Sequence, residues 1–139
     1  MSETCKLLFV YGTLLRGDRG SSGRGQRARL AREAEWRGRA RTAGLLYDLG
    51  RYPGLVVSAQ PGAEVHGEIF ELADPEHTLR WLDAYEGIVP GQPSCGEYQR
   101  VLRPIARAEG DPTVAWVYVY RNSVAGAVLI PDGRWITAG

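Results

Sequence analysis

Glycine interrupts this chain repeatedly and leaves room mainly for short regular elements. The sequence holds 18 Gly and 8 Pro among 139 residues. Most segments between them are short, apolar and rich in β-branched or aromatic residues, which is typical of strands joined by turns. Two other segments have helical spacing. The pattern predicts an α+β fold, a small mixed β-barrel that is closed or nearly closed, with helices packed outside it.

The expected elements follow the order strand, helix, several strands, helix, strands. We expect strands at residues 6–11, 40–49, 55–57, 65–72, 98–106 and 113–121, and helices at 26–36 and 75–86. Gly38 and Gly87 would end the two helices. Loops are expected at 17–25 and 88–96, a turn at 51–54 and a hairpin turn at 109–112.

Length and composition predict one folded domain over residues 1–139. Hydrophobic residues make up 44% and charged residues 24%, which argues against disorder. The net charge of +1 provides no strong field to attract nucleic acid or an anionic membrane. No secretory leader and no run of roughly 20 apolar residues is visible, so we expect a cytoplasmic protein, monomeric or homodimeric.

Cysteine and histidine are too few and too scattered to predict a metal site. Cys5 and Cys95 lie far apart, and His66 and His77 form no cluster with them. No Asp, Cys or Ser neighbour suggests a catalytic triad. We therefore expect no metal and no cofactor, and free thiols, although the sequence leaves a Cys5–Cys95 disulfide open.

The glycine-rich stretch at residues 20–25 invites comparison with a phosphate-binding loop. It lacks the Gly-Lys-Ser/Thr ending and does not sit directly between a strand and a helix. Several Arg residues flank it, so contact with an acidic partner is conceivable. The composition favours a solvated, flexible loop instead.

Glu86 is the residue that most strongly suggests chemistry. It follows Leu79 by seven residues and Leu82 by four, so a helix places it on the same apolar face. Asp74 can cap this helix and Pro75 suits its first position. Burial and the negative end of the helix dipole would both raise the pKa of Glu86 toward the range of a general base.

A simpler interpretation of Glu86 stays open. The helix could unwind before this residue, leaving its side chain in water or paired with Arg100. On spacing alone, this simpler interpretation is favoured.

A binding role is conceivable for the turn after the first strand and for several aromatic residues. In Tyr11, Gly12, Thr13 and Leu14, the glycine would let the chain turn and expose successive N–H groups, which bind carboxylates or oxyanions. An ordinary strand-to-loop turn is the commoner outcome. Further residues that could line a pocket, or simply fill the barrel, are Tyr52, Gly54, Tyr98 and Tyr118.

Five segments in order resemble the γ-glutamylcyclotransferase-like superfamily, in its AIG2-like and γ-glutamylamine cyclotransferase branch. They lie at residues 9–14, 43–55, 65–70, 82–87 and 98–120, and the resemblance covers nearly the whole chain. No single segment is specific, but their order is. The loops at 17–25 and 88–96 are longer than is usual in that family, which bears on substrate identity.

The resemblance implies an enzyme that releases 5-oxoproline from a γ-glutamyl amide by attack of the substrate's own α-amine. It implies Glu86 as the acid/base and the turn at residues 11–14 as the holder of the glutamyl part, without metal or cofactor. The partner would be a small γ-glutamyl molecule, whose leaving group is an amine or amino acid. Two alternatives are a non-catalytic binding module for a γ-glutamyl-like ligand and, less favoured, a hydrolase of another class.

Overall fold

The computed structural model describes residues 5–18, 20, 23–50, 52–88 and 97–135. Eight strands and two helices occur in this part of the chain. In order they are β1 (Leu7–Val10), α1 (Arg24–Glu33), β2 (Ala34–Ala43), β3 (Leu45–Asp48), β4 (Pro53–Val56), β5 (Glu64–Leu72), α2 (Pro75–Tyr85), β6 (Tyr98–Arg107), β7 (Thr113–Tyr120) and β8 (Val128–Ile130).

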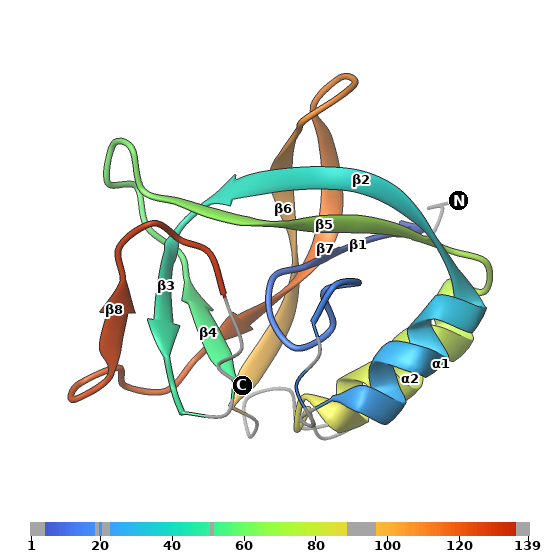
Figure 1. The fold of residues 1–139 in the computed structure, drawn as a ribbon, viewed down its shortest axis with the longest axis horizontal. Coiled ribbons are helices and arrows are strands. Elements are labelled where there is room, and N and C mark those ends of the chain that lie inside the picture. The colour runs from blue at the N-terminus through green and yellow to red at the C-terminus, as the bar shows by residue number, and fades with distance from the viewer. Residues whose placement is uncertain (1–4, 19, 21–22, 51, 89–96, 136–139) are drawn as a thin grey trace.

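The strands form one sheet that closes on itself. The strand order is β1-β5-β2-β6-β7-β4-β3-β8, and β1 also pairs with β7, so the first five of these strands form a barrel. The β1–β7 and β4–β7 pairs are parallel, whereas the other strand pairs are antiparallel. Strands β4, β3 and β8 extend the sheet beyond the barrel (Figure 1). The predicted α+β fold with a small mixed barrel is confirmed.

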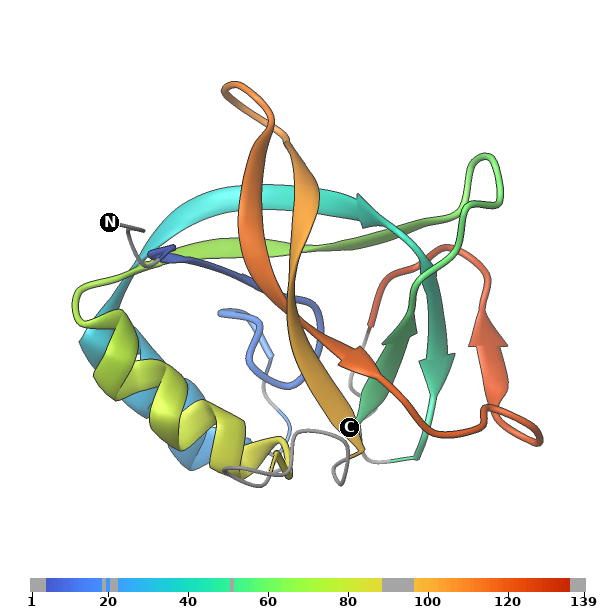
Figure 2. The ribbon, with the colours of Figure 1, turned by 180° about the vertical axis from the view of Figure 1, so that it is seen from behind.

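Both helices pack together outside the barrel, as expected (Figures 1 and 2). Glu33 at the end of α1 accepts hydrogen bonds from the Thr78 hydroxyl at 2.6 Å and from Trp81 Nε1 at 2.9 Å, both on α2. Asp74 caps α2 through its side chain, which accepts a hydrogen bond from His77 N at 3.3 Å. The predicted start of the second helix is therefore confirmed.

The predicted end of the first helix is wrong. α1 ends at Glu33, and the chain enters β2 at Ala34, so Trp36 lies in a strand opposite Phe70. Gly38 does not end a helix. It lies inside β2 with φ of +118°, where the register with β5 shifts, so its role is to permit a β-bulge.

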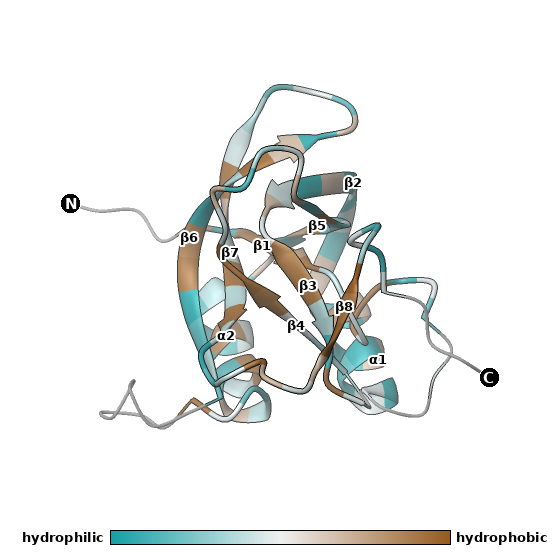
Figure 3. Ribbon diagram, turned by 90° about the vertical axis from the view of Figure 1, so that its left-hand side faces the viewer, coloured by the Kyte–Doolittle hydropathy of each residue, from teal (hydrophilic) through white to brown (hydrophobic). Residues whose placement is uncertain are grey.

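The structure also differs from the sequence expectation at two other strands. The strand expected at 40–49 is divided at Gly44, where an added Cβ would lie 3.0 Å from Val56 O. Strand β8 was not predicted at all. It pairs with β3 and carries exposed Val128 and Leu129, coloured brown in Figure 3. Most of the loop expected at 88–96 lies outside the described residues.

Side chains of β1 divide the core into two regions. Phe9 joins the buried cluster inside the barrel, whereas Leu8 and Val10 join the cluster between the sheet and the helices. Leu79 and Leu82 of α2 belong to the second cluster, which confirms that this helix face points inward. Burial of each such side chain contributes about 1.5–3 kcal/mol. The end of β1 and the end of α2 are thus held against each other.

Candidate active site

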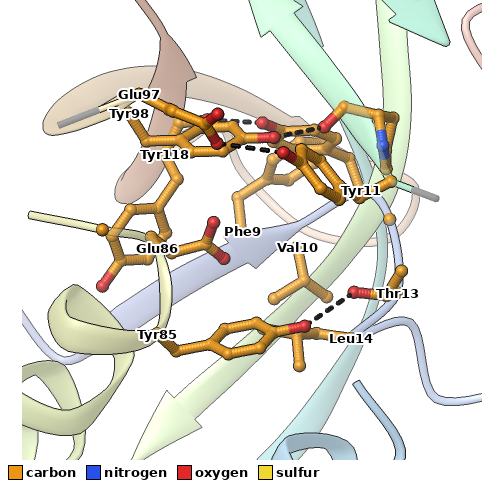
Figure 4. Close-up of a pocket in the computed structure, with 14 residues that line it drawn as sticks. Phe9, Val10, Tyr11, Thr13, Leu14, Tyr85, Glu86, Glu97, Tyr98 and Tyr118 are labelled. Atoms are coloured by element: carbon orange, nitrogen blue, oxygen red, sulfur yellow. Dashed lines mark hydrogen bonds between the residues drawn. The ribbon is translucent and has the colours of Figure 1, made fainter. Parts of the chain in front are cut away.

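A pocket of about 360 Å³ opens where the turn after β1 meets the end of α2. Glu86 lines it (Figure 4). Of the residues proposed from sequence to bind a substrate, Tyr11, Gly12, Thr13, Leu14, Tyr52, Tyr98 and Tyr118 line it as well. Gly54 does not line the pocket, because it packs against Leu49 and Tyr120, whose atoms would lie 2.9 Å from an added Cβ.

Glu86 is the residue at which α2 ends. Its N–H donates to Leu82 O at 2.9 Å, so the helical backbone still fixes its position. The side chain is half-buried and points into the pocket (Figure 4). In the part of the chain that the structure describes, no hydrogen bond or ion pair to its carboxylate is found.

The surroundings of Glu86 favour its protonated form. The pKa of Glu86 is raised to about 8, mainly by burial and in addition by the negative charges of Asp83 and Glu97. Of the two interpretations of Glu86 from the sequence, the one with burial and a raised pKa agrees with the structure, although spacing alone favoured the other. The sequence did not predict the two carboxylates. Arg100 pairs with Asp83 at 2.8 and 3.1 Å rather than with Glu86, so the simpler interpretation of Glu86 as its partner is wrong.

Gly12 is required by close packing. An added Cβ would lie 2.6 Å from Cγ and 2.8 Å from Cδ of Pro53, and the φ of Gly12 is not positive. The physical reason expected from the sequence, a conformation special to glycine, is therefore wrong. The turn itself exists, since Leu15 N donates to Gly12 O at 3.0 Å.

The turn leaves backbone donors beside the pocket. Among the hydrogen bonds between described residues, none uses the N–H groups of Gly12, Thr13 or Leu14 as donor. All three residues line the pocket. Adjacent free N–H groups of this kind bind a carboxylate or a developing oxyanion.

Two tyrosines build the rigid wall of the pocket. The Tyr11 hydroxyl donates to Tyr118 O at 2.5 Å and accepts from Leu55 N at 3.3 Å. The Tyr98 hydroxyl donates to Pro53 O at 2.8 Å. Burial raises the pKa of Tyr11 and of Tyr98, so both hydroxyls stay protonated as donors. They cannot serve as bases at neutral pH.

Other polar groups at the pocket are held by side chains. Tyr52 donates to Glu97 Oε2 at 3.0 Å, and the hydroxyls of Thr13 and Tyr85 lie 3.4 Å apart. Sequence reasoning missed Glu97 and Tyr85 as pocket residues. Tyr85 could have been found from its place beside Glu86, whereas nothing in the local pattern marks Glu97.

The pocket can hold a zwitterion in one orientation. The N–H groups of residues 12–14 favour a carboxylate, and the carboxylate of Glu97, together with Glu86 in its ionised form, favours an ammonium group. No Lys or Arg lies among the described lining residues. No group of His, Cys, Asp and Glu suited to a metal ion is found in the described residues, and none of the helices in that part is long and apolar enough to cross a membrane.

A second hollow, of about 560 Å³, is lined mainly by residues of β2 and β5. Three of its lining residues are the exposed Arg39, Arg41 and Arg134, and Glu68 lines it too. Arg41 pairs with Glu64 at 2.9 Å. No residue proposed from the sequence for catalysis or substrate binding lines this hollow.

Comparison with known proteins identifies relatives over nearly the full chain. The family model described as gamma-glutamyl cyclotransferase, AIG2-like, matches residues 8–137. The gamma-glutamylcyclotransferase family protein YtfP of Escherichia coli K12 is 35% identical over 137 residues, covering 93% of this chain and 95% of that protein. The crystal structure of a mouse AIG2-like protein matches with a TM-score of 0.64 and 30% identity, over 84% of this chain and 78% of that one.

Proposed function

The chain belongs to the gamma-glutamyl cyclotransferase, AIG2-like family, and we propose that it converts a γ-glutamyl amide into 5-oxoproline and a free amine. The observation that carries this proposal is the half-buried carboxylate of Glu86, which has no hydrogen-bond or ion-pair partner among the described residues and faces a pocket also bordered by backbone N–H groups that no described residue accepts from. A γ-glutamyl group carries an α-carboxylate and an α-ammonium, which these two features complement.

The proposed binding mode places the two charged groups of the substrate apart. The N–H groups of residues 12–14 hold the α-carboxylate, and the α-ammonium faces Glu86. The neutral hydroxyls of Tyr11 and Tyr98 are already bonded to the protein, so their rings shape the cavity and exclude water. Such positioning favours the conformer in which the α-nitrogen lies against the γ-carbonyl carbon.

Glu86 then moves the protons. With a pKa of about 8, Glu86 is a stronger base than an ordinary carboxylate, so taking a proton from the α-ammonium costs less. The freed amine attacks the γ-carbonyl, the ring C–N bond forms, and the original amide C–N bond breaks. Glu86 returns this proton to the leaving nitrogen, and the second proton that the attacking nitrogen loses on ring formation is passed on in the same way. Protons balance overall when the amine leaves as an ammonium ion.

Purified protein incubated with γ-glutamyl amino acids and γ-glutamyl amines provides the test, with 5-oxoproline measured by mass spectrometry. We expect release by the wild type, release at least about 100-fold slower by Glu86→Gln, and unchanged release by Glu76→Gln. Glu76 is the matched control, an exposed glutamate at the other end of α2.

Two results would contradict the proposal. If Glu86→Gln released 5-oxoproline as fast as the wild type, Glu86 would not be the acid/base. If no panel member were turned over, while calorimetry detected binding of a γ-glutamyl compound, the chain would be a non-catalytic binding module instead.

A further inference from the structure

Asp83 lies three residues before Glu86 on α2 and receives several hydrogen bonds from the sheet. Its Oδ1 accepts from Arg100 Nε at 2.8 Å and from the Tyr118 hydroxyl at 2.6 Å. Its Oδ2 accepts from Arg100 Nη2 at 3.1 Å. A bidentate guanidinium pair with an additional hydroxyl donor has a defined geometry that a single surface contact lacks.

The partners of Asp83 are themselves fixed. The Arg100 guanidinium lies over the ring of Trp116, 4.3 Å from its centroid. The side chains of Asp83 and Arg100 are each 23% exposed, so solvent screens the pair only in part. The C-terminal end of α2 is therefore attached to β6 and β7 through one carboxylate.

The same residue also holds the backbone around Glu86. Ile88 N donates to Asp83 O at 2.8 Å, and Glu86 N donates to Leu82 O at 2.9 Å. Side-chain and backbone bonds of Asp83 thus act on both sides of Glu86. A shift of this helix end would move the Glu86 carboxylate relative to the pocket.

Several titratable groups surround Glu86 from the elements packed around the pocket. They are Asp83 on α2, Glu97 just before β6, Tyr98 on β6, Tyr118 on β7, Tyr11 after β1 and Tyr52 before β4. Asp83 is paired to a guanidinium, whereas Glu97 is bonded to the Tyr52 hydroxyl. A substitution of Asp83 or Arg100 would therefore change the net charge near Glu86.

We propose that Asp83 is a positioning residue for Glu86, and that its ion pair with Arg100 sets how readily Glu86 accepts a proton. The kinetic consequence rests on the proposed function, but the electrostatic one does not. Because the two members of the pair carry opposite charges, removing one must act on Glu86 in the opposite sense to removing the other.

Matched substitutions separate this role from a structural one. Asp83→Asn keeps the shape and leaves the Arg100 cation unpaired, so the pKa of Glu86 should fall by about one unit. Arg100→Gln leaves the Asp83 anion unpaired, so the pKa should rise by a similar amount. The double variant should return toward the wild-type value. Tyr118→Phe removes one donor from Asp83 and should give a smaller rise.

The direct measurement is an NMR titration of ¹³C-labelled glutamate carboxyl groups, in which the Glu86 signal is the one lost in Glu86→Gln. It requires a folded protein and no turnover. The control is the double variant Glu76→Gln with Arg80→Gln, which removes an exposed ion pair from the same helix. This control should leave the Glu86 titration unchanged.

With an active substrate, the pH dependence of kcat/KM should move with the titration, to lower pH in Asp83→Asn and to higher pH in Arg100→Gln. Shifts in the same direction, or no shift in folded variants, would overturn the inference. Should Asp83→Asn or Arg100→Gln fail to fold, the Tyr118→Phe titration decides, and an unchanged pKa there overturns it. Opposite titration shifts without turnover of any γ-glutamyl compound would reject the proposed function and leave the Asp83–Arg100 effect on Glu86 established.

Discussion

The two hollows of this molecule differ in how their charges are arranged. The pocket beside Glu86 has two carboxylates and no Lys or Arg among its described lining residues, and most of its hydroxyls are bonded to the protein. The hollow over β2 and β5 is larger and has three arginines together with Glu68. Charge is more abundant in the second hollow, yet it is exposed and in part paired.

The pKa of one titratable residue in each hollow reflects this difference. In the first pocket, burial raises the pKa of Glu86 to about 8. In the second, burial lowers the pKa of His66, and Arg134 lowers it further. A neutral His66 among cations cannot easily take up a proton, whereas Glu86 exchanges one near neutral pH. Burial and neighbouring carboxylates, rather than the number of charges in a hollow, therefore bring the pKa of Glu86 into the range of a general acid or base.

The largest expected difference between the two hollows is in kcat, and a substitution in each hollow measures it separately. Glu86→Gln should lower kcat for 5-oxoproline release by about 10²–10⁴-fold, the usual contribution of a general acid or base. Arg39→Gln combined with Arg134→Gln should change kcat less than about twofold. Steady-state assays of both variants give the answer. A comparable loss in the arginine variant would mean that the second hollow takes part in turnover.

The pH dependence of the free energy of unfolding should also report the raised pKa of Glu86. Between the ordinary pKa of 4.5 and about 8, the folded state keeps a proton that the unfolded chain has released, so stability falls as pH rises through this window. The Glu86→Gln variant has no carboxyl group at this position, so this loss of stability with rising pH is absent. Relative to the wild type, its free energy of unfolding should increase by about 4 kcal/mol from pH 5 to pH 9, as measured by urea denaturation.

The control for this stability prediction is Glu76→Gln, which removes an exposed carboxylate from the same helix. Its difference from the wild type should stay nearly constant over the same range. A pH-independent effect of Glu86→Gln would show that Glu86 titrates normally, and the contrast between the two hollows would then lose its basis.

A substitution at Gly12 tests whether the turn at residues 12–14 binds the carboxylate of the substrate. In Gly12→Ala, the new Cβ would overlap Pro53, so the turn must move and its N–H groups with it. We expect KM for a γ-glutamyl amide to rise about tenfold, which corresponds to about 1.4 kcal/mol. Gly25→Ala on α1 is the control, because no atom lies within 4 Å of its added Cβ. An unchanged KM in Gly12→Ala would argue against a carboxylate held by this turn.

The sequence offered an inward position for Glu86 as one of two interpretations, because local periodicity encodes which face of a helix is apolar. The spacing from Leu79 and Leu82 is a property of one helix, and both leucines are buried as expected. The barrel was predictable for a similar reason, since strand segments and glycine turns are local features. The end of α1 was not, because Glu35 and Trp36 fit a helix by propensity, and pairing with β5 overrides that preference.

The unpredicted parts of the site depend on distant contacts. Arg100 was considered a partner for Glu86, but the register of β6 and β7 places it against Asp83 instead. Gly12 was assigned a conformational role, whereas Pro53, 41 residues further along the chain, is what excludes a side chain there. Each contact joins residues from elements far apart in the chain, and no local pattern in the sequence reports it.

The smallest expected effect concerns Tyr52, at the rim of the first pocket. Tyr52→Phe removes the donor that holds Glu97, so the Glu97 carboxylate is free to turn toward solvent and away from Glu86. Its charge then raises the pKa of Glu86 less, and the acidic limb of the kcat/KM profile should move to lower pH by less than about half a unit, with a change of about two- to fivefold in kcat/KM. Arg41→Gln removes a comparable exposed contact from the second hollow and should leave the profile unchanged. Equal profiles for the wild type and Tyr52→Phe would mean that burial and Asp83 alone determine the pKa of Glu86. A shift of the profile in Arg41→Gln would instead mean that the charges of the second hollow influence the pKa of Glu86 in the first pocket.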